Sequence, residues 1–136
     1  MANEQPPTSE VKLEHLPSVP DSHDELIRLF SFDAEEAAAL MTAVSDWLRD
    51  PSAPLQVDTL PFVTRVNCAV RFELAPKDDG IQELSPYTYV CRMTVDSFKA
   101  MLELMSPFAN GGSLGHQWLH DMDTPIDLLF SQNGSW

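Results

Sequence analysis

A strict two-residue alternation between positions 65 and 74 constrains this chain more than any other feature of its sequence. Apolar side chains stand at every second position, and mostly polar side chains stand between them. Because successive side chains of a β-strand point to opposite faces, the pattern predicts a strand with one buried face and one outward face. The first set is Val66, Cys68, Val70, Phe72 and Leu74, and the second is Arg65, Asn67, Ala69, Arg71 and Glu73.

A second alternating stretch follows, and its apolar positions are Tyr87, Tyr89, Cys91, Met93 and Val95. The segment 77–80 between the two stretches has turn chemistry, with a glycine able to adopt positive φ. We therefore predict that residues 65–75 and 87–95 form an antiparallel pair. A turn centred on positions 79 and 80 sets Cys68 opposite Cys91, which makes both of them buried structural thiols.

Two amphipathic helices are also predicted. Asp33 and Glu36 form a capping-box pattern, and Asp50 before Pro51 ends the first helix. Its apolar stripe is Ala37, Leu40, Met41, Val44 and Leu48. The second helix is expected to begin with Asp96 as its N-cap and to end at Pro107. It turns a second apolar stripe inward, consisting of Phe98, Met101, Leu102 and Met105.

The remaining apolar segments are short. Residues 26–31 and 126–131 are predicted strands, and 55–58 is a short extended piece. The order of elements predicts an α+β fold: a two-layer sandwich with a mostly antiparallel sheet of about five to six strands and two helices on one face. Residues 1–22 are polar and rich in proline, so we expect a disordered or loosely attached tail before a single domain at 23–136.

The charge balance restricts the partners. The 136 residues include 21 acidic and 8 basic side chains, for a net charge of −13. The basic residues are scattered, which argues against nucleic acid and against an anionic membrane surface. Positions 1–20 lack a signal-peptide pattern, and no apolar run is long enough to span a membrane. These features predict a cytoplasmic protein with reduced cysteines.

One catalytic motif matches by letters alone. The segment 111–115 fits the G-x-S-x-G pattern around Ser113. That pattern needs a strand before the serine and an acid between the serine and the histidine of a triad. Here a helix precedes it, and no acid lies between Ser113 and His120. We therefore interpret the segment as a loop and predict neither catalytic residues nor a cofactor.

A histidine pair is the one candidate metal site. If the segment is helical, His116 and His120 lie one turn apart and can chelate one ion, with Asp121 or Asp123 adding an oxygen ligand. The general base of the H-E-x-x-H pattern is absent, because Gln117 occupies its position. If the segment is a strand, the two histidines lie about 13 Å apart and cannot share a metal.

Two functional hypotheses follow. The first is a non-catalytic acidic module that binds a protein partner, possibly a basic one, as an inhibitor or immunity-type protein does. Its candidate contact residues are Arg65, Asn67, Arg71, Glu73, Trp118 and Trp136, and a homodimer is compatible with it. The alternative is a metal-binding protein or metal-dependent enzyme that uses His116, His120, Asp121 and Asp123.

Overall fold

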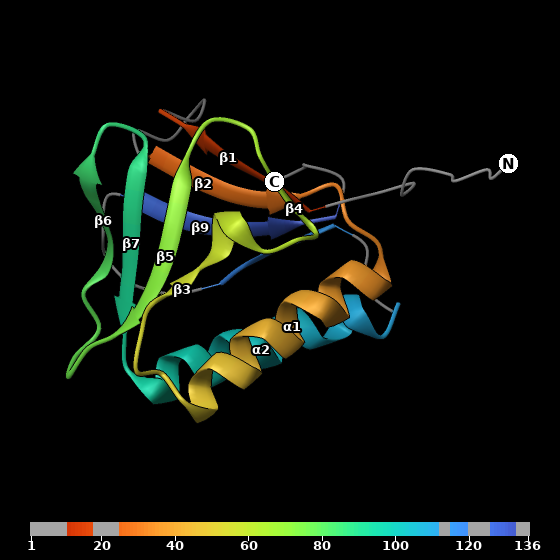
Figure 1. The fold of residues 1–136 in the computed structure, drawn as a ribbon. Helices are drawn as coiled ribbons and strands as arrows, with labels where there is room; N and C mark the ends of the chain where they lie inside the picture. The colour runs from red at the N-terminus through yellow and green to blue at the C-terminus, as the bar shows by residue number, and fades with distance from the viewer. Residues whose placement is uncertain (1–10, 18–24, 112–114, 120–125, 133–136) are drawn as a thin grey trace, which may run out of the picture.

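The computed structural model describes residues 11–17, 25–111, 115–119 and 126–132. Within these residues, two helices are combined with two β-sheets, one of five strands and one of four (Figure 1). The predicted α+β class is confirmed. The predicted single sheet is wrong, because the strands divide into two separate sheets. Both sheets are mixed, with four antiparallel and three parallel pairings.

The five-stranded sheet has the order β4-β1-β2-β9-β8. Its central strands β1, β2 and β9 are six residues long, and its two edge strands are only three residues long. The strands are β1 (Val11–Leu16), β2 (Glu25–Phe30), β4 (Val63–Arg65), β8 (His116–Trp118) and β9 (Ile126–Ser131). The strands predicted at 26–31 and 126–131 are therefore confirmed as β2 and β9.

The N-terminal strand β1 corrects the tail prediction. Residues 11–16 pair with β2 on one side and with β4 on the other. Val11, Leu13 and His15 alternate along β1 and are buried. This alternation binds the segment into the sheet although its neighbours are polar and rich in proline. The rest of the predicted tail, at 1–10 and 18–22, lies outside the described residues.

The four-stranded sheet has the order β3-β5-β7-β6 and overturns the predicted antiparallel pair. Strands β5 and β7 are parallel, with Phe72 opposite Cys91. The reason is that residues 80–85 form a strand of their own, β6, which pairs antiparallel with the far edge of β7. Cys68 therefore does not lie opposite Cys91. The strands are β3 (Leu55–Gln56), β5 (Ala69–Leu74), β6 (Gly80–Ser85) and β7 (Thr88–Met93). A 3₁₀ turn at Val57–Thr59 follows β3.

The first helix, α1 (Ala34–Arg49), begins and ends as predicted. The Asp33 carboxylate accepts a hydrogen bond from the Glu36 N–H at 2.9 Å, and Glu36 Oε1 accepts one from the Asp33 N–H at 3.0 Å. This capping box satisfies two backbone donors that no helical carbonyl can reach. Asp50 is the C-cap, directly before Pro51.

The second helix, α2 (Val95–Ala109), differs from its prediction at both ends. Its N-cap is Thr94 rather than Asp96, because the Thr94 hydroxyl accepts a hydrogen bond from the Ser97 N–H at 3.2 Å. Pro107 lies inside the last turn instead of ending the helix. A proline so close to the C-terminus of the helix removes only one hydrogen bond, from the final turn. The helix can therefore continue for two more residues.

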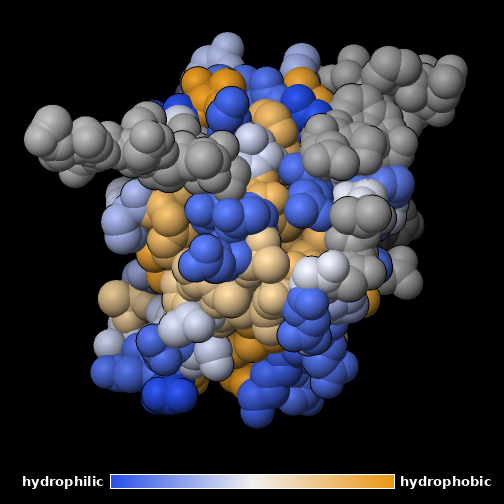
Figure 2. Space-filling model, turned by 90° about the vertical axis from the view of Figure 1, so that its right-hand side faces the viewer, coloured by the Kyte–Doolittle hydropathy of each residue, from blue (hydrophilic) through white to orange (hydrophobic). Residues whose placement is uncertain are grey.

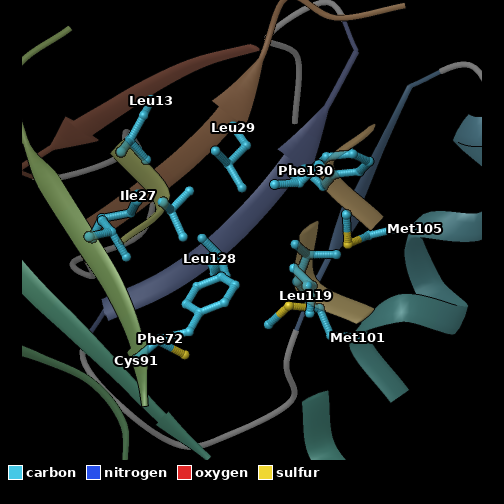
Figure 3. Packing of buried hydrophobic residues seen from close by; sticks show 14 of the residues in the cluster. Leu13, Ile27, Leu29, Phe72, Cys91, Met101, Met105, Leu119, Leu128 and Phe130 are labelled. Carbon is cyan, nitrogen blue, oxygen red and sulfur yellow. The ribbon is translucent and has the colours of Figure 1, made fainter. Parts of the chain in front are cut away.

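Both helices and both sheets contribute to one hydrophobic core. The helices lie side by side below the sheets in Figure 1. In Figure 3, Ile27, Leu128 and Phe130 of the five-stranded sheet face Phe72 of the other sheet and Met105 of α2. Trp47 of α1 joins this core through edge contact with Phe98, at a ring-centroid distance of 5.0 Å.

Candidate functional site

Two of the predicted contact residues, Arg71 and Glu73, lie on β5 and are tied to each other. Arg71 Nε lies 2.7 Å from Glu73 Oε2, and Arg92 Nη1 of β7 lies 3.0 Å from Glu73 Oε1. Arg92 also lies 3.5 Å from the Asp79 carboxylate. Two arginines and two carboxylates thus neutralise one another on the face of this sheet that points away from Phe72 and the core.

The other two residues of that predicted strand face lie elsewhere. Arg65 ends β4, and Asn67 lies in the connection to β5. The predicted strand is interrupted here. The Val66 N–H donates to the Leu13 carbonyl at 2.9 Å, so the segment stays beside β1 before it crosses to the second sheet. The prediction of one strand over 65–75 is therefore wrong, and the four side chains do not share one face.

Asn67 has a structural partner in β1. Its Oδ1 accepts a hydrogen bond from the His15 N–H at 2.7 Å, and its Nδ2 donates to the His15 carbonyl at 2.9 Å. The Asn67 side chain thus pairs with both backbone polar groups of His15, as a neighbouring strand would. Arg65 is exposed and lies 3.9 Å from the buried carboxylate of Asp58.

His116 and Trp118 share the exposed face of the edge strand β8, while Gln117 faces the other way and is half-buried. Their rings meet edge to face, with centroids 6.2 Å apart. The helical alternative is wrong for residues 116–118, so helical spacing gives His116 no chelating partner. His120, Asp121, Asp123 and Trp136 lie outside the described residues. Where the structure is described, no three His, Cys, Asp or Glu side chains are grouped to hold a metal. The metal site stays a prediction.

The two cysteines are buried free thiols, as predicted. Burial raises the pKa of Cys68 to about 12, and the negative charge of Asp58 adds to this effect. Burial likewise raises the pKa of Cys91 to about 12, with a further contribution from Asp78. Because the thiolate is the reactive form, both side chains are inert at neutral pH.

A buried histidine cluster, which the sequence analysis did not predict, joins the two sheets. His15 of β1 is 7% exposed, and its Nε2 lies 2.8 Å from Glu25 Oε2 of β2. Its ring stacks on Tyr89 of β7, with centroids 5.1 Å apart and planes at 23°. Burial raises the pKa of Tyr89 to about 12, and the charges of Glu83 and Glu25 contribute. The alternation of Val11, Leu13 and His15 was the signal that could have placed His15 inside.

This cluster contains a histidine–carboxylate pair, which is an arrangement suited to general-base catalysis. However, the group that faces the imidazole is a phenol held in its protonated form, and the ring is packed flat against it. Both cysteine thiols are protonated as well. The cluster therefore acts as a link between the sheets, and it presents no activated nucleophile among the described residues.

A surface pocket of about 140 Å³ lies where α1 ends. Its walls come from the indole of Trp47, the segment 51–54 and the end of β5, including Glu73 and Leu74. Pockets that enclose metabolite-sized ligands are larger, about 300–1,000 Å³. Its single carboxylate, Glu73, is already paired with two arginines. This pocket is therefore smaller than those that enclose metabolites.

Among the residues that the structure describes, the most exposed large apolar side chain is Tyr87, at 58%, and it lies at the end of the β6–β7 hairpin. Leu84, on the neighbouring strand, is 48% exposed and lies at a shift in the β6–β7 register. Tyr87 also has a positive φ of 64°. Figure 2 views a different side of the molecule, where α1 begins, and shows a weakly apolar area framed by hydrophilic side chains.

None of the helices described is long and apolar enough to cross a membrane. Comparison with known proteins finds no matching family model, no matching curated protein and no matching solved structure.

Proposed function

We propose that this chain is a non-catalytic acidic domain that binds a basic protein partner, in the manner of an inhibitor or immunity-type protein. The observation that carries the proposal is the internal neutralisation of its arginines. Each of the five lies within 4 Å of one of the chain's own carboxylates. The pairs are Arg28–Glu14, Arg49–Asp46, Arg65–Asp58, Arg71–Glu73 and Arg92–Glu73.

This pairing concentrates the net charge of −13 on the remaining carboxylates. Glu35, Glu83, Asp96 and Glu103 are exposed, and none of them has an ion pair to another described residue. A surface with surplus negative charge and few free cations attracts a positively charged protein from a distance and repels acidic ones. The charge therefore favours fast association with a basic partner.

The placement of the reactive side chains supports a role without catalysis. Both thiols are buried in protonated form, and His15 is packed between Glu25 and Tyr89. The carboxylate in the pocket beside α1 is neutralised by Arg71 and Arg92. These groups stabilise the fold, whereas a catalytic group has to reach a substrate.

The test is retention of a partner from lysate of cells that produce the protein, at low salt, followed by elution with a salt gradient. We expect a basic protein to be retained and to elute as the Debye length shrinks from about 14 Å near 0.05 M to about 3 Å near 1 M. The variant compared with the unaltered chain is the triple variant Glu35→Gln, Asp96→Asn, Glu103→Gln, which removes three exposed charges and leaves the core unchanged.

The same partner should elute from the triple variant at lower salt. Absence of any retained protein at low salt contradicts the proposal. A partner that binds the two forms equally at every salt concentration contradicts its electrostatic part. Sedimentation velocity at low and high salt tests self-association as the alternative, since copies that each carry −13 repel one another most strongly at low salt.

A further inference from the structure

We infer that the end of the β6–β7 hairpin, with Leu84 and Tyr87, is the element that docks into an apolar pocket on that basic partner. This inference rests on the proposed function and identifies the surface that performs it. Four observations carry it: backbone strain at Tyr87, the exposure of Leu84 at a bulge, the anchoring of the turn to neighbouring strands, and the local charge.

The strain at Tyr87 comes from the turn it occupies. Pro86 fixes its own φ near −65°, and Tyr87 follows with a φ of 64°. A φ of 64° lies in the left-handed region, which favours glycine because the Cβ of any other residue crowds the backbone there. The chain thus places a tyrosine where glycine is preferred. Tyr87 is 58% exposed and makes no aromatic ring contact with any other described residue, so the fold gains little from the ring.

Leu84 is presented by a second irregularity, three residues earlier. Glu83 pairs with Tyr89 and Ser85 pairs with Thr88, so Leu84 lies at the bulge between these pairs. Bulges re-aim side chains and concentrate at functional edges of sheets. Within four residues, two departures from regular geometry each expose a large apolar side chain. Exposed tyrosines of this kind are enriched among residues that dominate binding energy.

The turn between β6 and β7 is anchored to the neighbouring strands. The Ala69 N–H donates to the Tyr87 carbonyl at 2.8 Å, and so fastens the turn to β5. Two residues along β7, Tyr89 stacks on His15, which in turn binds Glu25. The apolar tip is therefore presented on a preorganised support, which lowers the entropy lost on binding.

The charge around the tip indicates the chemistry of the partner. Glu83 is the only charged residue between Gly80 and Val90, and it is exposed. Glu25 lies at the same end of the sheets, next to His15 and Tyr89. An apolar tip beside the exposed carboxylate of Glu83 complements an apolar pocket with a basic rim.

The first experiment maps the contact in the cells that produce the protein. A photoreactive benzophenone amino acid replaces Leu84, Tyr87, Val95 or Trp118, one at a time. Val95 is the matched control, because it is also an exposed apolar position, at 38%. Trp118, at 39%, is the rival contact position that the sequence predicted. We expect one basic protein to crosslink from positions 84 and 87 and not from 95 or 118. Crosslinks confined to 118, or crosslinks to a second copy of this chain, overturn the inference.

The second experiment measures the affinity of the purified crosslinked partner for Tyr87→Gly, Tyr87→Phe and Val95→Ala. Tyr87→Gly relieves the turn strain, so its melting temperature should rise by about 2–5 °C while its affinity falls tenfold or more, on the order expected for a hot-spot residue. Tyr87→Phe and Val95→Ala should retain binding. If the partner binds Tyr87→Gly as tightly as the unaltered chain, the hairpin is not the docking element, although the proposed function stands. If no partner is found by retention or by crosslinking, the proposed function itself fails.

Discussion

His15 of β1 stacks on Tyr89 of β7, and this contact connects the inner faces of two sheets that share no strand. The imidazole is also bound to Glu25 through Nε2. One side chain therefore joins three strands, β1, β2 and β7. It does so close to the turn that exposes Tyr87.

Replacing His15 by alanine should destabilise the fold by about 2–4 kcal/mol, since the change removes a buried ring and leaves a cavity beside Tyr89. Urea denaturation of the unaltered chain and of His15→Ala measures the difference. The matched control is His116→Ala, an exposed histidine at the edge of the same sheet, whose change should stay within about 0.5 kcal/mol. Equal effects of the two substitutions would show that the His15 link contributes nothing.

The fold should lose stability in alkaline solution. The pKa values of Cys68, Cys91 and Tyr89 are raised to about 12 from ordinary values of 9.0 for a thiol and 10.0 for a phenol. The folded chain therefore holds these three protons more tightly than the unfolded chain does. Their contribution to stability is complete below pH 9 and is lost as the pH rises through the window from 9 to about 12.

The urea midpoint measured between pH 7 and pH 11 tests this expectation. It should be steady up to about pH 9 and then decline. Cys68→Ala and Cys91→Ala should each make the decline shallower, because one thiol no longer has to ionise on unfolding. A midpoint that stays constant to pH 11 would contradict the burial of these groups.

Local signals predicted the first helix well, and non-local pairing explains most of what was missed in the sheets. The capping box at Asp33 and the stripe of α1 depend on residues three or four positions apart, so they can be read directly. The parallel pairing of β5 with β7 depends on β6, whose sequence does not alternate clearly. Alternation says which face a side chain occupies but not which strand lies beside it.

The same distinction applies to the candidate site. Burial of the two cysteines followed from alternation and is confirmed. The contact of His15 with Tyr89 and the positive φ of Tyr87 depend on how the sheets meet and on turn geometry, which the pattern of apolar residues does not record. Tyr87 was assigned to the apolar face of a strand, although Pro86 before it pointed to a turn.

The N-cap of α2 offers a direct test of the structure against the sequence pattern. Thr94→Ala should cost about 1 kcal/mol, since it removes the acceptor of the Ser97 N–H and a hydroxyl bonded to Asp78. Asp96→Ala should cost less than about 0.5 kcal/mol, because Asp96 is exposed and contributes only its charge near the helix start. Thermal unfolding of both variants distinguishes the two assignments. A larger loss for Asp96→Ala would restore Asp96 as the cap.

Asn67 was predicted to contact a partner, and its role in the fold can be tested against that prediction. Its amide makes both hydrogen bonds to the backbone of His15, so Asn67→Ala leaves two backbone groups unpaired and should cost about 1–3 kcal/mol. Arg65→Ala is the matched control, because Arg65 is exposed and its carboxylate partner is 3.9 Å away. That variant should lose less than about 1 kcal/mol. Asn67→Asp keeps the acceptor for the His15 N–H but sets a carboxylate against the His15 carbonyl, so its urea midpoint should fall as well. If Asn67→Ala were as stable as the unaltered chain but bound the basic partner more weakly, Asn67 would belong to the contact surface after all.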